Sequence, residues 1–328
     1  MTVNFSSAGS NTPEPSESIT YSWNFGDGSA ASLDPNPSHV YAQAGEYTAT
    51  LTVTDTSGDK ATANLLIIVG NTGPTVTVTT PPEGGTFAFG NNIPFSVTVT
   101  DPEDGPINCS RVTVTFVLGH DTHGHAEQSV TGCSGVLGTD AGDVSHGGNV
   151  FGVISASYTD NGGLGGTRAI QSTGQKNIRQ KRQEVEVAVS QSGTNTAGNN
   201  DGGVAGTHRG NLAAGEWIQL NGPFDLRNIN SITFRVADAV AGRTAGSPLA
   251  SVELRQDAID GPILTTANLT STGGTAVWTS QTFPFSQSGA QLGTHPLFLV
   301  FREVPNGATG ANLFNLNWAE FNGQGVGS

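Results

Sequence analysis

Hydrophobic and polar residues alternate along most of this chain, which is the pattern of strands with one buried and one solvated face. Alternating segments occur at residues 21–25, 47–53, 63–69, 95–99, 112–118, 150–158, 232–237, 251–255 and 296–301. Glycine-rich, polar turns separate them, and the longest apolar run, 65–69, is far too short to cross a membrane as a helix. The pattern predicts an all-β protein built from short strands.

The last strand is predicted at residues 312–321. Its odd-numbered face carries Asn315 and Asn317, although asparagine is rare in strand interiors. The even-numbered face carries the predicted packing residues Phe314, Leu316 and Trp318. Two carboxamides on one face indicate either a solvated surface or a polar site, and the alternation alone leaves both open.

The strands and turns group into three β-sandwich domains in tandem. We expect an immunoglobulin-like sandwich at 1–70, a second immunoglobulin-like domain at 71–168 and a jelly roll at 175–328. Gly- and Pro-containing segments at 71–74 and 162–166 provide the linkers. Because a strand-like segment follows Met1 at once, the chain is expected to begin inside a longer protein.

The net charge of −14 is concentrated in the first half of the chain. Residues 1–165 carry 16 acidic and two basic side chains, whereas residues 166–328 carry 11 of each sign. An acidic half disfavours nucleic acid and anionic membranes as partners, and it favours divalent cations. We therefore expect neither nucleic-acid binding nor membrane insertion.

The chain has two cysteines, Cys109 and Cys133, with no CxxC motif. A disulfide between them is favoured over two free thiols, and it indicates an extracellular or cell-surface protein. Closing a loop of this length would stabilise the fold by roughly 3 kcal/mol.

A histidine-rich stretch, Gly-His-Asp-Thr-His-Gly-His, lies at residues 119–125. The candidate ligands of a transition metal are His120, His123, His125 and His146, with Asp140 and Asp143 nearby. Imidazole and carboxylate at this spacing suit zinc, copper or nickel, and a polar loop that bonds its own backbone is the alternative. No nucleophile motif or paired carboxylates accompany the histidines, so we predict no catalytic residue and no enzyme activity.

The first domain resembles a known family. Its motifs are Trp-Asn-Phe-Gly-Asp-Gly-Ser at 23–29, His-Val-Tyr at 39–41 and Gly-Glu-Tyr at 45–47. Together they resemble the polycystic-kidney-disease (PKD) domain, in which Asp usually stands at the position of Asn24. The resemblance implies an immunoglobulin-like spacer or interaction module of secreted proteins. Asp27 invites a metal-ligand interpretation, but a turn-capping carboxylate is favoured.

The third domain resembles a family 6 carbohydrate-binding module. The motifs are Glu-x-Glu at 184–186, Gly-Glu-Trp-Ile at 215–218, Arg-Val-Ala at 235–237, Thr-Gly-Gly at 272–274 and Asn-Leu-Asn-Trp at 315–318. The resemblance implies that Trp217 and Trp278 enclose a sugar ring while Asn315 bonds its hydroxyls. Aromatic faces stack on sugar C–H groups and a carboxamide offers both a donor and an acceptor. Core packing remains the alternative for both tryptophans.

The same resemblance implies a structural calcium ion, held by Glu184, Glu186 and a residue of the last strand. That residue is Asn317 here, where the family has Asp, so oxygen ligation survives with one negative charge fewer. Asn315 and Asn317 can serve two ligands only if the strand twists or bulges, or if the ligands lie at opposite ends of the face.

We therefore expect a non-catalytic carbohydrate-binding and spacer region of a secreted bacterial multi-domain protein. Its partners would be a polysaccharide or glycan and an upstream domain of the same polypeptide. The Cys…His-rich…Cys segment is similar to units that follow PKD domains in large secreted bacterial proteins. The alternative is a structural or adhesive fibre-forming protein whose modules self-assemble.

Overall fold

The computed structural model describes residues 1–14, 16–120, 123–140, 150–198, 201, 206–286 and 293–327. In these residues the structure is β-strand with three short 3-10 helices, so the predicted all-β fold is confirmed. None of the helices described is long and apolar enough to cross a membrane. The chain divides into two compact units: Met1–Val76 with Val99–Asn108 and Tyr158–Ser172, and Thr77–Thr98 with Cys109–Ser157 and Thr173–Ser328. The three predicted domain boundaries stay predictions.

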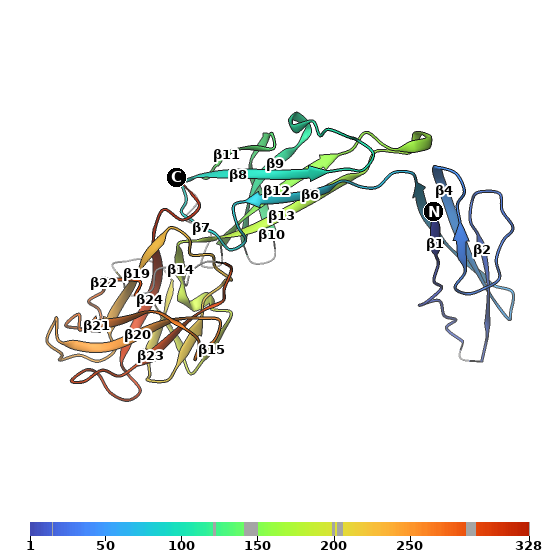
Figure 1. The fold of residues 1–328 in the computed structure, drawn as a ribbon. Coiled ribbons are helices and arrows are strands. Elements are labelled where there is room, and N and C mark those ends of the chain that lie inside the picture. Colours follow the sequence, from blue (N-terminus) through green and yellow to red (C-terminus); the bar gives the residue numbers. More distant parts are fainter. Residues whose placement is uncertain are drawn as a thin grey trace. The chain divides into compact units, whose positions relative to one another are not determined.

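The first sandwich packs a two-stranded sheet, β1-β3, and a three-stranded sheet, β2-β4-β5 (Figure 1). The strands are β1 (Thr2–Asn4), β2 (Ile19–Asn24), β3 (Ser38–Val40), β4 (Gly45–Asp55) and β5 (Lys60–Val69). Aromatic side chains dominate its core, which is formed by Phe5, Trp23, Phe25, Tyr41, Ala49, Leu51, Ile67 and Val69. The motif residues Trp23, Phe25 and Tyr41 are thus packing residues, and Tyr41 also donates its hydroxyl to the Phe25 carbonyl at 2.9 Å.

Two further sheets follow, ordered β10-β9-β12-β13-β7 and β11-β8-β6. Their strands are β6 (Thr75–Thr80), β7 (Thr86–Phe87), β8 (Asn92–Thr100), β9 (Thr113–His120), β10 (His123–Thr131), β11 (Ser134–Gly138), β12 (Val150–Thr159) and β13 (Gln171–Gln180). The 3-10 helices η1 (Cys109–Arg111) and η2 (Leu164–Gly166) connect them. The Cys109–Cys133 disulfide is present, which confirms that prediction.

The C-terminal jelly roll consists of sheets β16-β17-β24-β19-β22, with β14 also paired to β24, and β15-β18-β23-β20-β21. Its elements are β14 (Arg182–Glu184), η3 (Val185–Val187), β15 (Ser190–Ser192), β16 (Asn195–Gly198), β17 (Thr207–Leu212), β18 (Trp217–Gln219), β19 (Ile229–Asp238), β20 (Pro248–Gln256), β21 (Ile263–Thr270), β22 (Thr279–Pro284), β23 (Leu297–Arg302) and β24 (Phe314–Gly323). One apolar core lies between the two sheets.

The last strand, β24, departs from the predicted alternation. Val236 of β19 pairs with Leu316, but Phe234 pairs with Ala319, so β24 contains an extra residue between Leu316 and Ala319. This β-bulge reverses which residues face the core. Before the bulge the even-numbered residues Phe314 and Leu316 are in the core, and after it the odd-numbered residues Ala319 and Phe321 are in the core. The prediction that Trp318 continues the packing row is therefore wrong: Trp318 is only partly buried, and the Arg182 guanidinium lies over its ring at 4.4 Å.

Backbone hydrogen bonds join the jelly roll to strand β7 and the turn before it within the second compact unit. The Asp225 N–H donates to the Gly84 carbonyl and the Val326 N–H donates to the Thr86 carbonyl, each at 2.8 Å. Main-chain bonds of this kind tie the end of the jelly roll to the preceding sandwich.

Candidate functional site

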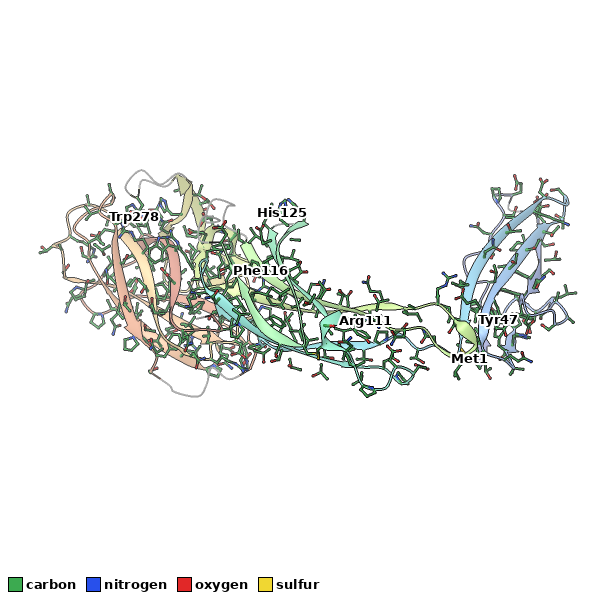
Figure 2. The ribbon with its side chains drawn as sticks, turned by 90° about the horizontal axis from the view of Figure 1, so that it is seen from above. Met1, Tyr47, Arg111, Phe116, His125 and Trp278 are labelled. Atoms are coloured by element: carbon green, nitrogen blue, oxygen red, sulfur yellow. A yellow bond between two sulfur atoms is a disulfide. The ribbon has the colours of Figure 1, made fainter. Side chains whose placement is uncertain are left out.

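Trp278 lies immediately before β22 in the jelly roll (Figure 2), and its ring contacts His208 of β17. The two ring centroids are 5.0 Å apart in an edge-on arrangement. Trp278 is 8% exposed and His208 is 5% exposed. Burial lowers the pKa of His208, so its imidazole is held in the neutral form that packs against an aromatic ring. The sequence pattern offered no signal for His208 in this position.

Asn315 is positioned by main-chain groups of two neighbouring strands. Its Oδ1 accepts the Asn211 N–H at 2.9 Å and its Nδ2 donates to the Asp238 carbonyl at 3.3 Å. A bulge in β17 and a φ of 54° at Asn211 turn that N–H toward the side chain instead of the ladder. The carboxamide therefore has a structural role as well as its predicted role in reading a sugar.

Gly210 lies between these side chains and brings them into one cluster. A Cβ at this glycine would be 3.4 Å from His208 Nε2 and 3.7 Å from Asn315 Oδ1. Trp278, His208 and Asn315 therefore form a contiguous cluster beside Gly210, which we call the β17–β24 cluster.

Asp238 holds the Thr-Gly-Gly turn that precedes Trp278. Its fully buried carboxylate accepts the Ser271 hydroxyl at 2.7 Å and the Thr272 N–H at 2.9 Å. The Asp238 N–H in turn donates to the Thr272 hydroxyl at 3.1 Å. Because the Asp238 carbonyl also accepts from Asn315, one residue links the turn to the carboxamide. Sequence reasoning missed this anchor, although the acid ends an apolar strand and was visible as such.

Trp217 lies elsewhere, on β18 in the other sheet of the jelly roll. Its neighbour Ile218 enters the core, so the alternation of the strand directs Trp217 to the outer face. There its partly exposed ring contacts Phe298, with centroids 5.9 Å apart. Trp278, by contrast, lies in the turn before β22, an edge strand of the other sheet. The prediction that Trp217 and Trp278 enclose one sugar ring stays a prediction.

Charged side chains of β20 and β23 share the outer sheet face with Trp217. Val300 of β23 pairs with Trp217 of β18 on one side and with Glu253 of β20 on the other. The side chains of Trp217 and Glu253 therefore lie on the same face of the sheet. The Glu253 carboxylate accepts from Arg255 and Arg302 at 3.0 and 3.1 Å. We call this set, Trp217, Phe298, Glu253, Arg255 and Arg302, the β18–β20 face.

The predicted calcium ligands lie near the start of the jelly roll and on β24. Burial raises the pKa of Glu184 and of Glu186, and the charge of Glu184 raises the pKa of Glu186 further. Glu186 Oε2 is buried and accepts no hydrogen bond from the described residues. Glu184 already accepts the Arg182 Nε–H at 2.8 Å. Two carboxyls with raised pKa values and one buried oxygen without a hydrogen bond from the described residues fit a hard cation, which would add positive charge beside them.

Asn317 has a partner that the sequence did not predict. Its Nδ2 donates to Asp201 Oδ2 at 3.0 Å, and Asp201 also forms a two-pronged ion pair with Arg235 at 2.6 and 2.8 Å. If Asn317 bound an ion it would do so through Oδ1, since Nδ2 is committed to Asp201. The bulge, which contains Asn317, gives Asn315 and Asn317 separate sets of partners along one strand.

Three histidines of the predicted transition-metal site meet on the β9–β10 hairpin. The candidate ligand atoms of His120, His123 and His125 all lie within 4.8 Å of one another. His146 and Asp143, which were predicted to lie near them, fall outside the described residues.

Fold and sites together define a tandem β-sandwich protein whose jelly roll carries two sets of aromatic and polar side chains. The model of the PKD domain matches residues 1–69, and the model of the carbohydrate binding module (family 6) matches residues 184–323. The chain thus contains a PKD domain and a family 6 carbohydrate-binding module, and the predicted resemblance to both is confirmed. Both are non-catalytic kinds of domain.

The chain is similar to parts of larger proteins. Collagenase ColA of Bacillus cereus is 29% identical over 157 residues, which are 44% of this chain and 15% of that protein. Arabinoxylan arabinofuranohydrolase of Bacillus subtilis is 31% identical over 121 residues, 37% of this chain and 21% of that protein. A β-1,3-glucan-binding family 6 module of Bacillus halodurans is 29% identical over 43% of this chain and 93% of that one, with a TM-score of 0.35. The chain therefore spans less than a quarter of either enzyme.

Proposed function

We propose that residues 184–323 hold a secreted, multi-domain protein on a polysaccharide, and that the preceding sandwiches act as a non-catalytic spacer. The observation that carries this proposal is the match of this region to the family 6 carbohydrate-binding module. The Cys109–Cys133 disulfide supports a location outside the reducing cytosol, because disulfides persist in oxidising environments.

The β18–β20 face is one candidate sugar-binding surface. Its Trp217 ring is partly exposed on the outer side of a sheet, where it can stack on the C–H face of a sugar. Glu253 and the two arginines beside it offer an acceptor and several donors to hydroxyl groups at the ring edge. A sheet face with one aromatic ring suits binding along the length of a polysaccharide better than binding of its terminal sugar in a pocket.

The β17–β24 cluster is the second candidate. Trp278 and Asn315 are the residues that the family resemblance assigns to the sugar, and His208 and Gly210 lie between them. The low exposure of Trp278 and Asn315, 8% for each residue, limits the ring area available for stacking. Binding here would therefore depend more on hydrogen bonds than on stacking.

We further propose that Glu184 and Glu186 hold a structural calcium ion with Asn317. The ion would neutralise two partly buried carboxylates and join η3 to β24. Its contribution would be to the stability of the module, with sugar affinity affected only indirectly.

A polysaccharide panel tests the proposal. The full chain is incubated with insoluble arabinoxylan, xylan, β-1,3-glucan, mixed β-glucan and agarose, each with and without a calcium chelator, and the bound fraction is measured. Trp217→Ala should abolish binding if the β18–β20 face is used, whereas Trp278→Ala should abolish it if the cluster is used. Each variant is the matched control for the other, because both remove one tryptophan from the same module.

The contrary result is retention of binding in the Trp217→Ala, Trp278→Ala double variant, or the absence of binding to every polysaccharide. Absence of binding together with concentration-dependent assembly in sedimentation would favour the alternative, a fibre-forming or adhesive protein.

A further inference from the structure

Three imidazoles gather at the turn end of the β9–β10 hairpin, in the sandwich that precedes the jelly roll. Figure 2 labels one of them, His125. The Nε2 atoms of His120 and His125 are 3.0 Å apart. The ring centroids of His120 and His123 are 4.0 Å apart, and those of His123 and His125 are 5.2 Å apart. His120 is partly buried, while His123 and His125 are exposed.

The hairpin register brings the three side chains to one face. His120 pairs directly with His123 across the two strands, and paired residues of an antiparallel ladder point to the same side. His125 follows two residues after His123 and therefore shares that side. His125 pairs with Leu118, whose side chain is buried in the sandwich core. The three histidines therefore lie on the side of the hairpin that faces the core further along β9.

A β-bulge makes this arrangement compatible with the rest of β10. The register shifts between Ala126 and Gln128, so Glu127 is an extra residue in the strand. At the other end of the hairpin, Val130 pairs with the core residue Val114. Without the extra residue, a strand that directs Val130 to the core would direct His123 and His125 to the opposite face. The bulge thus sends the histidines to the side that His120 occupies.

The separation of the nitrogens matches a coordination sphere. Two ligands of a tetrahedral ion with metal–nitrogen bonds of about 2.0–2.1 Å are about 3.4 Å apart. The candidate nitrogens here lie between 3.0 Å, for His120 and His125, and the 4.8 Å limit that encloses all three. Small rotations about the side-chain torsions of the two exposed histidines would bring the larger separations to that value, without movement of the backbone.

Charge also favours a cation of this kind. Three imidazoles that are all protonated would repel one another at these distances, whereas a neutral imidazole can offer a ring-nitrogen lone pair to a cation. The net charge of −14, all of it in the first half of the chain, lowers the electrostatic cost of bringing a dication to this hairpin.

We propose that His120, His123 and His125 bind one divalent transition-metal ion of the zinc, copper and nickel type. Imidazole nitrogen is the preferred donor for these ions and a poor one for calcium or magnesium, so the site is chemically different from the Glu184–Glu186 pair. Three protein ligands leave at least one coordination position for water or for a donor from another molecule. This site does not depend on sugar binding.

Isothermal titration of the full, untagged chain with ZnCl₂ tests the proposal. The chain is first stripped with chelator and then kept in excess CaCl₂, so that carboxylate sites are filled with calcium. We expect one zinc ion per chain, and a Kd that rises more than 100-fold in His123→Gln and in His125→Gln. Loss of an outer-shell partner alone costs roughly 10–100-fold, so loss of a direct ligand should exceed it.

His295→Gln is the matched control, since it removes a histidine of the jelly roll that is bonded to Asp257. It should bind zinc as the unmodified chain does. Unchanged thermal melting of all three variants without metal checks that they are folded, and X-ray absorption of the zinc-loaded chain should report three imidazole nitrogens. The proposal is overturned by the absence of stoichiometric zinc, or by folded His123→Gln and His125→Gln variants that bind it normally.

Discussion

Asn317 donates its side-chain amide to the carboxylate of Asp201 at 3.0 Å. Asp201 thus places a carboxylate beside Asn317, but Arg235 neutralises that carboxylate. The negative charge that an aspartate would provide at position 317 is therefore not restored. Glu184 and Glu186 are left as the charged part of the proposed calcium site. The first prediction follows from their burial.

Without calcium, stability should fall as the pH rises above about 4.5. Burial raises the folded-state pKa of Glu184 and Glu186 above that ordinary value, so stability is fully present below it and is lost as the pH rises through the raised values. Calcium should reverse this loss, because it stabilises the ionised carboxylates. Thermal melting from pH 4 to 8, with calcium and with chelator, measures both effects.

The Glu186→Gln variant is the control for that experiment. It should show a weaker dependence on pH and a smaller gain in melting temperature from calcium. An equal calcium response in the variant and the unmodified chain would contradict the assignment.

Replacing Asn315 by alanine should destabilise the jelly roll even without a sugar present. The change removes the partner of the Asn211 N–H, which is only partly buried, and of the buried Asp238 carbonyl, for which the cost is about 1–3 kcal/mol. Chemical denaturation measures the loss, with Asn230→Ala, at an exposed position of the same domain, as the comparison. Equal stabilities for the two variants would show that Asn315 is not a structural link.

The first sandwich should contain a strongly acidic carboxyl group. The Ser29 hydroxyl and then His39 hydrogen-bond to Asp27 and lower its pKa to about 2. A lowered folded-state pKa contributes stability that is present above the ordinary value of 3.8 and is lost as the pH falls toward 2. Carboxyl NMR titration should give a value near 2, which supports the turn-capping role; a value near 4 would contradict the bonds to Ser29 and His39.

Gly26 and Gly28 offer a matched pair of substitutions in the same turn. Both have positive φ, 78° and 80°, but only at Gly26 would a Cβ collide with the Thr48 backbone. Gly28→Ala should cost about 1 kcal/mol from conformation alone, and Gly26→Ala should cost more, because the backbone of β4 must also move. The full chain is denatured and the unfolding of residues 1–76 is monitored by tryptophan fluorescence, which gives the loss of stability in each variant. Equal losses would refute the steric argument.

Reduction of the Cys109–Cys133 disulfide should destabilise the sandwich that contains it. The crosslink spans 24 residues, which corresponds to about 3 kcal/mol of lost chain entropy in the unfolded state. A Cys109→Ser, Cys133→Ser double variant avoids a leftover thiol. Its unfolding transition should shift to lower denaturant, while that of the PKD domain should stay in place.

The sequence determined much of the architecture without help from tertiary contacts. Alternation with a period of two specifies which face of a strand is apolar, and glycine-rich turns separate the strands, so the all-β class followed from local pattern. The motifs of the first and third domains carried enough order and spacing to identify the PKD domain and the family 6 module. The cysteine pair was foreseeable because only two cysteines exist.

Tertiary structure decided where side chains on different strands meet. Trp217 and Trp278 were predicted to enclose one sugar ring. Trp217 lies on β18 of one sheet and Trp278 lies directly before β22 of the other, and strand order of this kind depends on long-range pairing. The bulges in β10 and β24 reverse the face of every residue beyond them: one brings His123 and His125 to His120, and the other removes Trp318 from the core row. An extra residue in a ladder is a property of two strands together, so the period of either strand alone does not predict it.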